Sequence, residues 1–226
     1  MSAKITQEIF ENEMMDVETI FLCANLSRSA YSIENEIEDE SRVVVERENA
    51  KCMFSFDSGK MYVAIAGTDD PFDVLSDFEF HHVVDESTHE LVHMGFKNEA
   101  DKLFPSIHKE IVMRGVNQLI LTGHSLGGAI CVIIAARLQQ MIPELSCKLI
   151  TFGSPRVGTK SFVKKIKCRH TRVVCNRDPI PHFPPYFFGF KHHGTVMTLK
   201  SNILFSIKQH SINAYINALQ IFQTHQ

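Results

Sequence analysis

Apolar residues recur along the chain with two periods, which mark the predicted helices and strands. The helical spacing of Val17, Ile20 and Phe21 predicts an amphipathic helix within residues 14–31. Alternating or continuous apolar runs predict strands at 42–47, 51–56, 61–66, 117–122, 147–152, 171–176 and 194–199, with a hairpin turn at 57–60. Spacings of three and four residues predict further helices at 94–113, 125–141, 159–167 and 210–223. Pro105 should break or kink the first of these.

Strands alternate with helices in the second half of the chain. That order is typical of an α/β fold, in which a mostly parallel sheet is covered by helices on both faces. The 226 residues contain no internal repeat, low-complexity tract or linker, and their number suits one core. We therefore expect a single α/β domain over residues 1–226.

Composition narrows the classes of protein that remain. No apolar run reaches the length of a membrane span, and the first residues are polar and acidic, unlike a signal peptide. The six cysteines lack the spacing of metal ligands, and most lie in apolar contexts, where buried thiols are common. We expect a cytoplasmic protein with no metal, no cofactor and no nucleic-acid partner, and we leave its oligomeric state open.

Charge is distributed unevenly between the two halves of the chain. Residues 1–124 hold 24 acidic and 10 basic side chains, whereas residues 125–226 hold 2 acidic and 13 basic ones. We favour an arrangement in which the halves interleave in one sheet and their charges face each other across the surface. The alternative is a basic face for an anionic membrane or substrate. Its candidates are Lys160, Lys164 and Lys167, which have the spacing of one helix face.

The most specific motif is Gly-His-Ser-Leu-Gly at residues 123–127, between a predicted strand and a predicted helix. A strand, a Gly-x-Ser-x-Gly turn and a helix form the nucleophile elbow of serine hydrolases. The glycines let strand and helix approach closely, and the tight turn should leave the Ser125 hydroxyl exposed. The free N–H groups of the following helix would face a developing oxyanion. The motif predicts Ser125 as a nucleophile.

A serine nucleophile of this kind needs an acid later in the chain. Only Glu144 and Asp178 follow Ser125. Glu144 lies in a helix-to-strand connection, which belongs at the opposite end of the sheet. Asp178 follows the strand predicted at 171–176, at the edge where parallel sheets place their sites. We therefore expect Asp178 to be the acid.

Five histidines follow Asp178 and compete for the role of general base. His182 is too close in sequence, and His225 lies near a fraying end. His192 and His193 lead into the last predicted strand, whereas His210 follows it. Because the base of such a triad lies on a loop after the last strand, we prefer His210 and keep His193 as the alternative.

Two N–H donors should hold the oxyanion. The backbone of Leu126, the residue after the nucleophile, is the first. The second should come from a loop after an earlier strand, and the strand that runs into Gly67 and Thr68 fits.

Taken together, these motifs resemble the class 3 lipases, also called the fungal lipase-like family, over residues 20–220. The resemblance implies an α/β-hydrolase fold and a role for Thr68 as backbone and hydroxyl donor to the oxyanion. The matching segments are Ala-Gly-Thr at 66–68, Asp-Val-Leu-Ser-Asp at 73–77, Val-His-Met-Gly-Phe at 92–96, the elbow at 123–129, Ile-Thr-Phe-Gly-Ser-Pro-Arg-Val-Gly at 150–158, Asn-Arg-Asp-Pro-Ile-Pro at 176–181, His-Gly-Thr at 193–195 and His-Ser-Ile-Asn-Ala-Tyr at 210–215.

The chain departs from the family pattern at two positions and in one segment. Ala66 stands where the family has Arg, and Val74 stands where it has Trp. The segment 69–80, where family lipases carry an apolar lid helix, is acidic and only modestly apolar. We therefore expect weak activation at a lipid interface. The aromatic stretch 184–190 is expected to line an acyl site, to touch lipid or simply to pack as a loop.

The residues and the resemblance predict a serine esterase or lipase that hydrolyses carboxylic, acylglycerol-type esters through an acyl-enzyme. Its partners would be a lipid or small ester, with possible peripheral contact to an anionic membrane. His124 and His193 are added as candidates for substrate contact. Two alternatives stay open, namely a catalytically silent lipase-like interaction module and an acyltransferase that uses the same triad.

Overall fold

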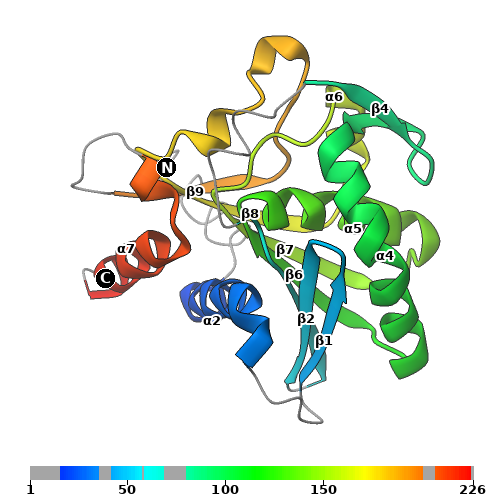
Figure 1. Cartoon of the computed structure of the whole chain (residues 1–226), viewed down its shortest axis with the longest axis horizontal. Helices are drawn as coiled ribbons and strands as arrows, with labels where there is room; N and C mark the ends of the chain where they lie inside the picture. The colour runs from blue at the N-terminus through cyan, green and yellow to red at the C-terminus, as the bar shows by residue number, and fades with distance from the viewer. Residues whose placement is uncertain (1–15, 36–41, 58, 69–79, 201–206, 225–226) are drawn as a thin grey trace, which may run out of the picture.

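A seven-stranded sheet forms the centre of the computed structural model, which describes residues 16–35, 42–57, 59–68, 80–200 and 207–224 (Figure 1). The strand order is β1-β2-β3-β6-β7-β8-β9. The first three strands pair antiparallel, and all pairs from β3 to β9 are parallel, which confirms the predicted mostly parallel sheet. Their bounds are Arg42–Arg47 (β1), Ala50–Asp57 (β2), Lys60–Ile65 (β3), Gln118–His124 (β6), Ser146–Phe152 (β7), Arg169–Cys175 (β8) and Thr195–Leu199 (β9).

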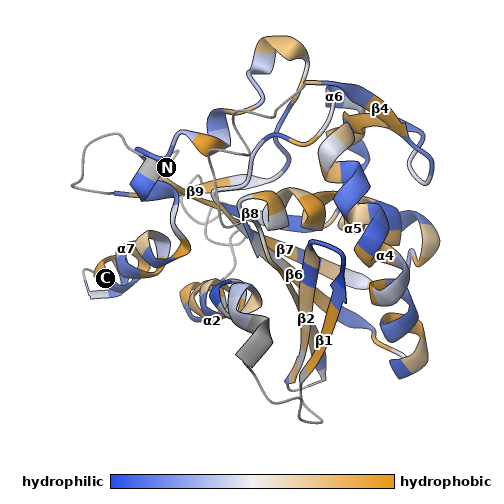
Figure 2. Cartoon of the chain, viewed as in Figure 1, coloured by the Kyte–Doolittle hydropathy of each residue, from blue (hydrophilic) through white to orange (hydrophobic). Residues whose placement is uncertain are grey.

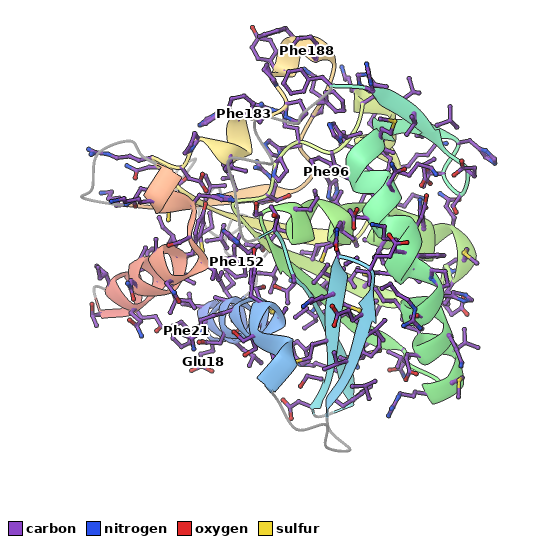
Figure 3. All side chains as sticks on the ribbon, viewed as in Figure 1. Glu18, Phe21, Phe96, Phe152, Phe183 and Phe188 are labelled. Atoms are coloured by element: carbon purple, nitrogen blue, oxygen red, sulfur yellow. The ribbon has the colours of Figure 1, made fainter. Side chains whose placement is uncertain are left out.

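Helices cover both faces of this sheet, as predicted. Helices α2 and α7 share one apolar cluster with one sheet face, and α4 and α5 share a second cluster with the other. Figure 3 labels one core residue of each cluster, Phe152 near α2 and α7, and Phe96 near α5. The helices are α2 (Val17–Ser29), α4 (Met94–Arg114), α5 (Leu126–Met141), α6 (Lys160–Lys165) and α7 (Ile212–Thr224), with short 3-10 turns η1 (Ala30–Asn35), η2 (Ile180–His182), η3 (Tyr186–Phe188) and η4 (Ile207–His210).

Helix α5 is the most deeply buried helix of the described chain. Every residue from Gly127 to Leu138 is buried, because its sequence is apolar on all sides and it packs between the sheet and α4. In Figure 2 its ribbon is largely orange, in contrast to the mixed colours of α4. This burial fixes the helix that follows the Gly-x-Ser-x-Gly turn.

Three expectations about local structure were wrong or incomplete. A hairpin of β4 (His82–Asp85) and β5 (Glu90–His93) forms a separate two-stranded sheet that the apolar pattern did not predict. The break predicted as one outcome at Pro105 does not occur, because burial of Leu103 and Ile107 on either side outweighs one lost hydrogen bond and α4 continues through the proline. Lys167 lies beyond the end of α6, so it does not share a helix face with Lys160 and Lys164.

The two oppositely charged halves do not interleave within the sheet, contrary to expectation. Strands β1, β2, β3 and β6 come from residues 1–124 and β7, β8 and β9 from residues 125–226, and each set occupies its own side. The halves instead meet in ion pairs outside the sheet. Lys165 binds Glu90 at 2.8 Å, and the buried Arg137 donates from Nε to Asp85 Oδ2 at 2.7 Å. These pairs tie the β4–β5 hairpin to α5 and α6.

Within the described ranges, the helices are all too short or too polar to cross a membrane. The six cysteines are all described, buried and free of disulfide bonds. Burial raises the pKa of Cys23 and of Cys52 to about 12, so neither thiol ionises near neutral pH.

Two buried histidines, one in β8 and one in the connection between β8 and β9, hydrogen-bond neighbouring segments. His192 Nε2 donates to the Pro181 carbonyl at 2.8 Å, and His170 Nε2 lies 2.9 Å from the Thr151 hydroxyl. Burial lowers the pKa of His192 to about 3 and that of His170 well below its usual value. The His192 ring is therefore neutral in the folded protein at any pH above about 5.

These histidines should make the fold sensitive to acid. The unfolded chain binds a proton at each ring near pH 6.5, whereas the folded chain binds it only at a much lower pH. The contribution of His192 to stability is thus complete above pH 6.5 and is lost as the pH falls toward 3. We expect His192→Gln to reduce the slope of unfolding free energy against pH, between pH 6 and 4, by about 1.4 kcal/mol per pH unit. Urea denaturation across this range measures the slope, and an unchanged slope would contradict the assignment.

Candidate active site

Ser125 occupies a strained turn between β6 and α5. Its backbone has φ 56° and ψ −126°, a conformation that residues other than glycine adopt only when their surroundings enforce it. The Ser125 N–H donates to the Phe152 carbonyl at 2.9 Å, and the Ser125 carbonyl accepts from the Gly128 N–H at 3.0 Å. The neighbouring strand and the first turn of α5 therefore hold the serine from both sides.

The glycines around Ser125 permit a backbone approach that any side chain would block. A Cβ on Gly123 would lie 2.5 Å from the Gly127 carbonyl carbon. A Cβ on Gly127 would lie 2.8 Å from the carbonyl oxygen of Ala66. Both distances are shorter than van der Waals contact, so α5 can begin against the ends of β3 and β6 only with glycine at these positions.

Three side chains form a continuous hydrogen-bonded chain at this turn. The Ser125 hydroxyl lies 2.7 Å from His210 Nε2, and His210 Nδ1 lies 2.8 Å from Asp178 Oδ2. Ser125 follows β6, Asp178 follows β8 and His210 precedes α7, so three separate segments meet at the carboxyl edge of the sheet. Because a carboxylate only accepts, His210 Nδ1 carries the proton and Nε2 is free to accept from the serine hydroxyl.

Two further donors satisfy the buried carboxylate of Asp178. Tyr215 on α7 donates its phenol proton to Oδ2 at 2.5 Å, and the Ile180 N–H donates to Oδ1 at 2.9 Å. Burial, reinforced by the charge of Asp178, raises the pKa of Tyr215 well above its usual value, so the phenol keeps this proton. The carboxylate is thus held in one orientation toward His210.

Gly153 provides the space in which Asp178 and His210 meet. It follows β7 with a φ of 59°, and a Cβ there would lie 2.8 Å from Asp178 Oδ2 and 2.9 Å from His210 Cε1. A side chain at this position would push the two groups apart.

The His124 side chain forms a hydrogen bond with the backbone of His210. Its Nε2 bonds the His210 carbonyl, which can only accept, so Nε2 carries the proton. Its Nδ1 therefore accepts from the Tyr31 hydroxyl, 2.8 Å away. Burial and the neighbouring His210 lower the pKa of His124 well below its usual value, which keeps this arrangement neutral.

Two clefts border the residues next to Ser125 and share Tyr31 and Thr68 in their walls, while Ser125 is among the described lining residues of neither. One, of about 500 Å³, is also lined by Gly67 and Leu126, and the other, of about 440 Å³, by His124 and His210. The Leu126 N–H is the first of α5 and therefore has no acceptor within the helix. A Cβ added to Gly67 would lie 3.3 Å from the Ser125 Cβ, which places the Gly67–Thr68 turn directly beside the nucleophile.

The structure brings together most of the residues singled out from the sequence, with three differences. The Ser125 side chain is buried rather than exposed, with a residue exposure of 1%, because Gly67 and His210 pack against it. His193 lies beside His170, Nδ1 to Nδ1 at 3.3 Å, and lines neither cleft among the described residues. His124 borders a cleft, but both of its ring nitrogens already have protein partners. Of the acidic segment 69–80, residues 69–79 lie outside the described residues.

Tyr31, Gly153 and Tyr215 were not identified from the sequence as part of the site. Tyr31 and Tyr215 lie at helical spacing among apolar residues and look like ordinary core positions. Their only signal is a polar hydroxyl on a predicted buried face, which requires a hydrogen-bond partner.

Within the described ranges, histidine, cysteine and carboxylate side chains form no group that could hold a metal ion.

Comparison with known proteins places this site in a family. A family profile described as lipase (class 3) matches residues 62–188. A lipase of Rhizopus niveus is 37% identical over 120 residues, which are 49% of this chain and 31% of that protein. The secreted mono- and diacylglycerol lipase 1 of Fusarium solani is 34% identical over 108 residues, covering 45% and 32%. The chain thus matches about a third of the length of these relatives.

The folds also agree. A variant of Rhizomucor miehei lipase, in complex with its propeptide, superposes with a TM-score of 0.72 at 24% identity, covering 82% of this chain and 67% of that one. Lipase II of Rhizopus niveus superposes with a TM-score of 0.67 at 24% identity, covering 82% and 81%. The α/β-hydrolase fold is therefore shared, and because the profile matches more than half of the sequence, the chain belongs to the class 3 lipase family.

Proposed function

We propose that this chain is a serine hydrolase of carboxylic, acylglycerol-type esters that acts through an acyl-enzyme. One observation carries the proposal, namely the hydrogen-bonded chain from the Ser125 hydroxyl through His210 to Asp178. A protein that only binds partners has no need of a strained serine, a correctly protonated histidine and a fully satisfied carboxylate at one point. Membership of the class 3 lipases supports the same reaction.

In the proposed reaction, Ser125 Oγ attacks the ester carbonyl while His210 Nε2 takes its proton. Asp178 holds His210 in the required tautomer and stabilises the positive charge that the ring gains. The same proton then passes to the leaving alcohol, and an acyl group remains on Ser125. Water, deprotonated by His210, releases the acid and restores the serine.

The Leu126 N–H and Thr68 would bind the oxyanion that forms during attack. Leu126 opens α5, whose N-terminal dipole adds to the attraction, and Thr68 borders both clefts at the side of Ser125. Each such donor typically contributes about 3 kcal/mol to the transition state.

The two clefts suit the two parts of an ester substrate. They meet at Tyr31 and Thr68, beside the nucleophile, so an ester carbonyl at this point would direct its acyl chain into one and its alcohol into the other. The mono- and diacylglycerol lipases among the relatives point to acylglycerols as the substrate class.

Replacing the nucleophile provides the first test. We expect Ser125→Ala to lower kcat on a p-nitrophenyl ester at least about a thousandfold while the protein remains folded, because the covalent step is lost. A serine-directed phosphonate should add its mass to the unmodified chain at Ser125 and not to the variant. Wild-type turnover in the variant would overturn the proposal and favour an interaction module.

The second test separates the two candidate bases. We expect His210→Ala to abolish both turnover and phosphonate labelling, since the hydroxyl loses its proton acceptor. His193→Ala should keep kcat within about threefold, because His193 contacts His170 and not the serine. Loss of labelling in the His193 variant alone would reverse the assignment.

The third test concerns the support of Asp178. Tyr215→Phe removes one charge-assisted hydrogen bond from the carboxylate, so we expect kcat to fall about tenfold with KM nearly unchanged. Tyr62→Phe is the matched control, since Tyr62 is a buried tyrosine of the same apolar cluster. Equal effects of the two substitutions on kcat would show that Tyr215 serves only packing.

A further inference from the structure

Three consecutive aromatic side chains stand exposed at the tip of the connection between β8 and β9. Tyr186, Phe187 and Phe188 are 65%, 71% and 44% exposed. They form the turn η3, which projects away from the sheet at the top of Figure 1, where Figure 3 labels Phe188. We call these three residues the aromatic tip. Burying rings of this size is favourable, so their exposure implies a partner that covers them.

The residues on both sides of the aromatic tip are fixed by contacts with the rest of the protein. The fold therefore holds the tip in an exposed position. On one side, the Arg156 guanidinium donates to the carbonyls of His182 and Pro184. On the other side, Phe190 is fully buried and stacks on His82, with ring centroids 4.0 Å apart. Phe188 itself rests on Phe80 at 4.7 Å. The protein thus presents the tip on a fixed base.

Lys191 places a positive charge beside the tip and favours an anionic partner. Its Nζ lies 5.3 Å from the centre of the Tyr186 ring, and the connection that carries the tip, residues 176–194, contains one acidic residue, the buried Asp178. A tip of aromatic rings beside a cation suits a surface with apolar chains beneath anionic headgroups. A stable protein partner would require about 800 Å² of interface, contributed by 20–30 residues on each side, which is far more than three side chains at a point.

We propose that the aromatic tip inserts into the surface of a lipid layer bearing anionic headgroups and docks the protein there. The tip follows β8, whose carboxyl end also carries Asp178, so docking brings the Ser125 edge of the sheet toward the lipid. The proposal extends the proposed function, since it supplies the esters of that layer to the site. The tip lies in a different segment from the lysines at 160, 164 and 167, whose contact with a membrane stays a prediction.

The test uses the full chain and vesicles of phosphatidylcholine, with and without one third phosphatidylserine. We expect the wild type to co-sediment with the mixed vesicles at low salt, and the double variant Y186S/F187S to partition at least about tenfold less. The matched control is V112S/M113S, which removes two apolar side chains of similar exposure, 58% and 69%, from the far end of α4. This control should bind like the wild type, and Lys191→Gln should weaken binding to the mixed vesicles only.

Hydrolysis of p-nitrophenyl acetate, a small soluble ester, distinguishes this proposal from the proposed function. The tip variant should hydrolyse it at the wild-type rate, because the tip lines neither cleft in the described chain. Absence of this activity in the wild type overturns the hydrolase assignment and leaves vesicle binding as a separate result. Equal vesicle binding by wild type and tip variant overturns the docking proposal, as does binding by the wild type to neither kind of vesicle. If the wild type instead self-associates, the tip variant does not, and neither binds vesicles, the docking proposal is overturned in favour of a contact between copies of the chain.

Discussion

The close approach of helix α5 to the ends of β3 and β6 is the constraint on which the candidate site depends. The helix can begin there only because Gly123 and Gly127 carry no side chain. Its burial on all sides then fixes both the direction of the helix and the position of its first N–H groups. Ser125 is left with a backbone conformation that it would not adopt alone. The energy of packing α5 therefore maintains the strain at the serine.

A network of buried hydrogen bonds extends this order from the serine to the C-terminal helix. Each polar group in it has a defined role as donor or acceptor, because each histidine bonds a group that can only accept through one of its two ring nitrogens. The Asp178 carboxylate and the His210 carbonyl fix the tautomers of His210 and His124, respectively. Tyr215 lies one turn into α7, so the same helix that closes the apolar core also orients the acid. Fold stability and site geometry are in this way coupled.

Much of this arrangement could be predicted from the sequence, because it has a local signature. The elbow at residues 123–127, the strand before Asp178 and the loop at His210 follow from glycine placement and from apolar runs that end at polar residues. What could not be predicted depends on contacts between distant segments. Burial of Leu103 and Ile107 overrides the helix-breaking tendency of Pro105. The partners of Tyr31 and Tyr215 arise 93 and 37 residues away, and no periodicity within one element reports them.

The aromatic tip and its charged neighbour divide two aspects of the proposed docking between different side chains. A cation such as Lys191 is attracted to an anionic surface within about one Debye length, roughly 10 Å, before any ring makes contact. This attraction would govern the rate of capture, which salt slows, whereas the apolar rings would govern how long the protein stays. The two properties could evolve independently, because they reside in different side chains.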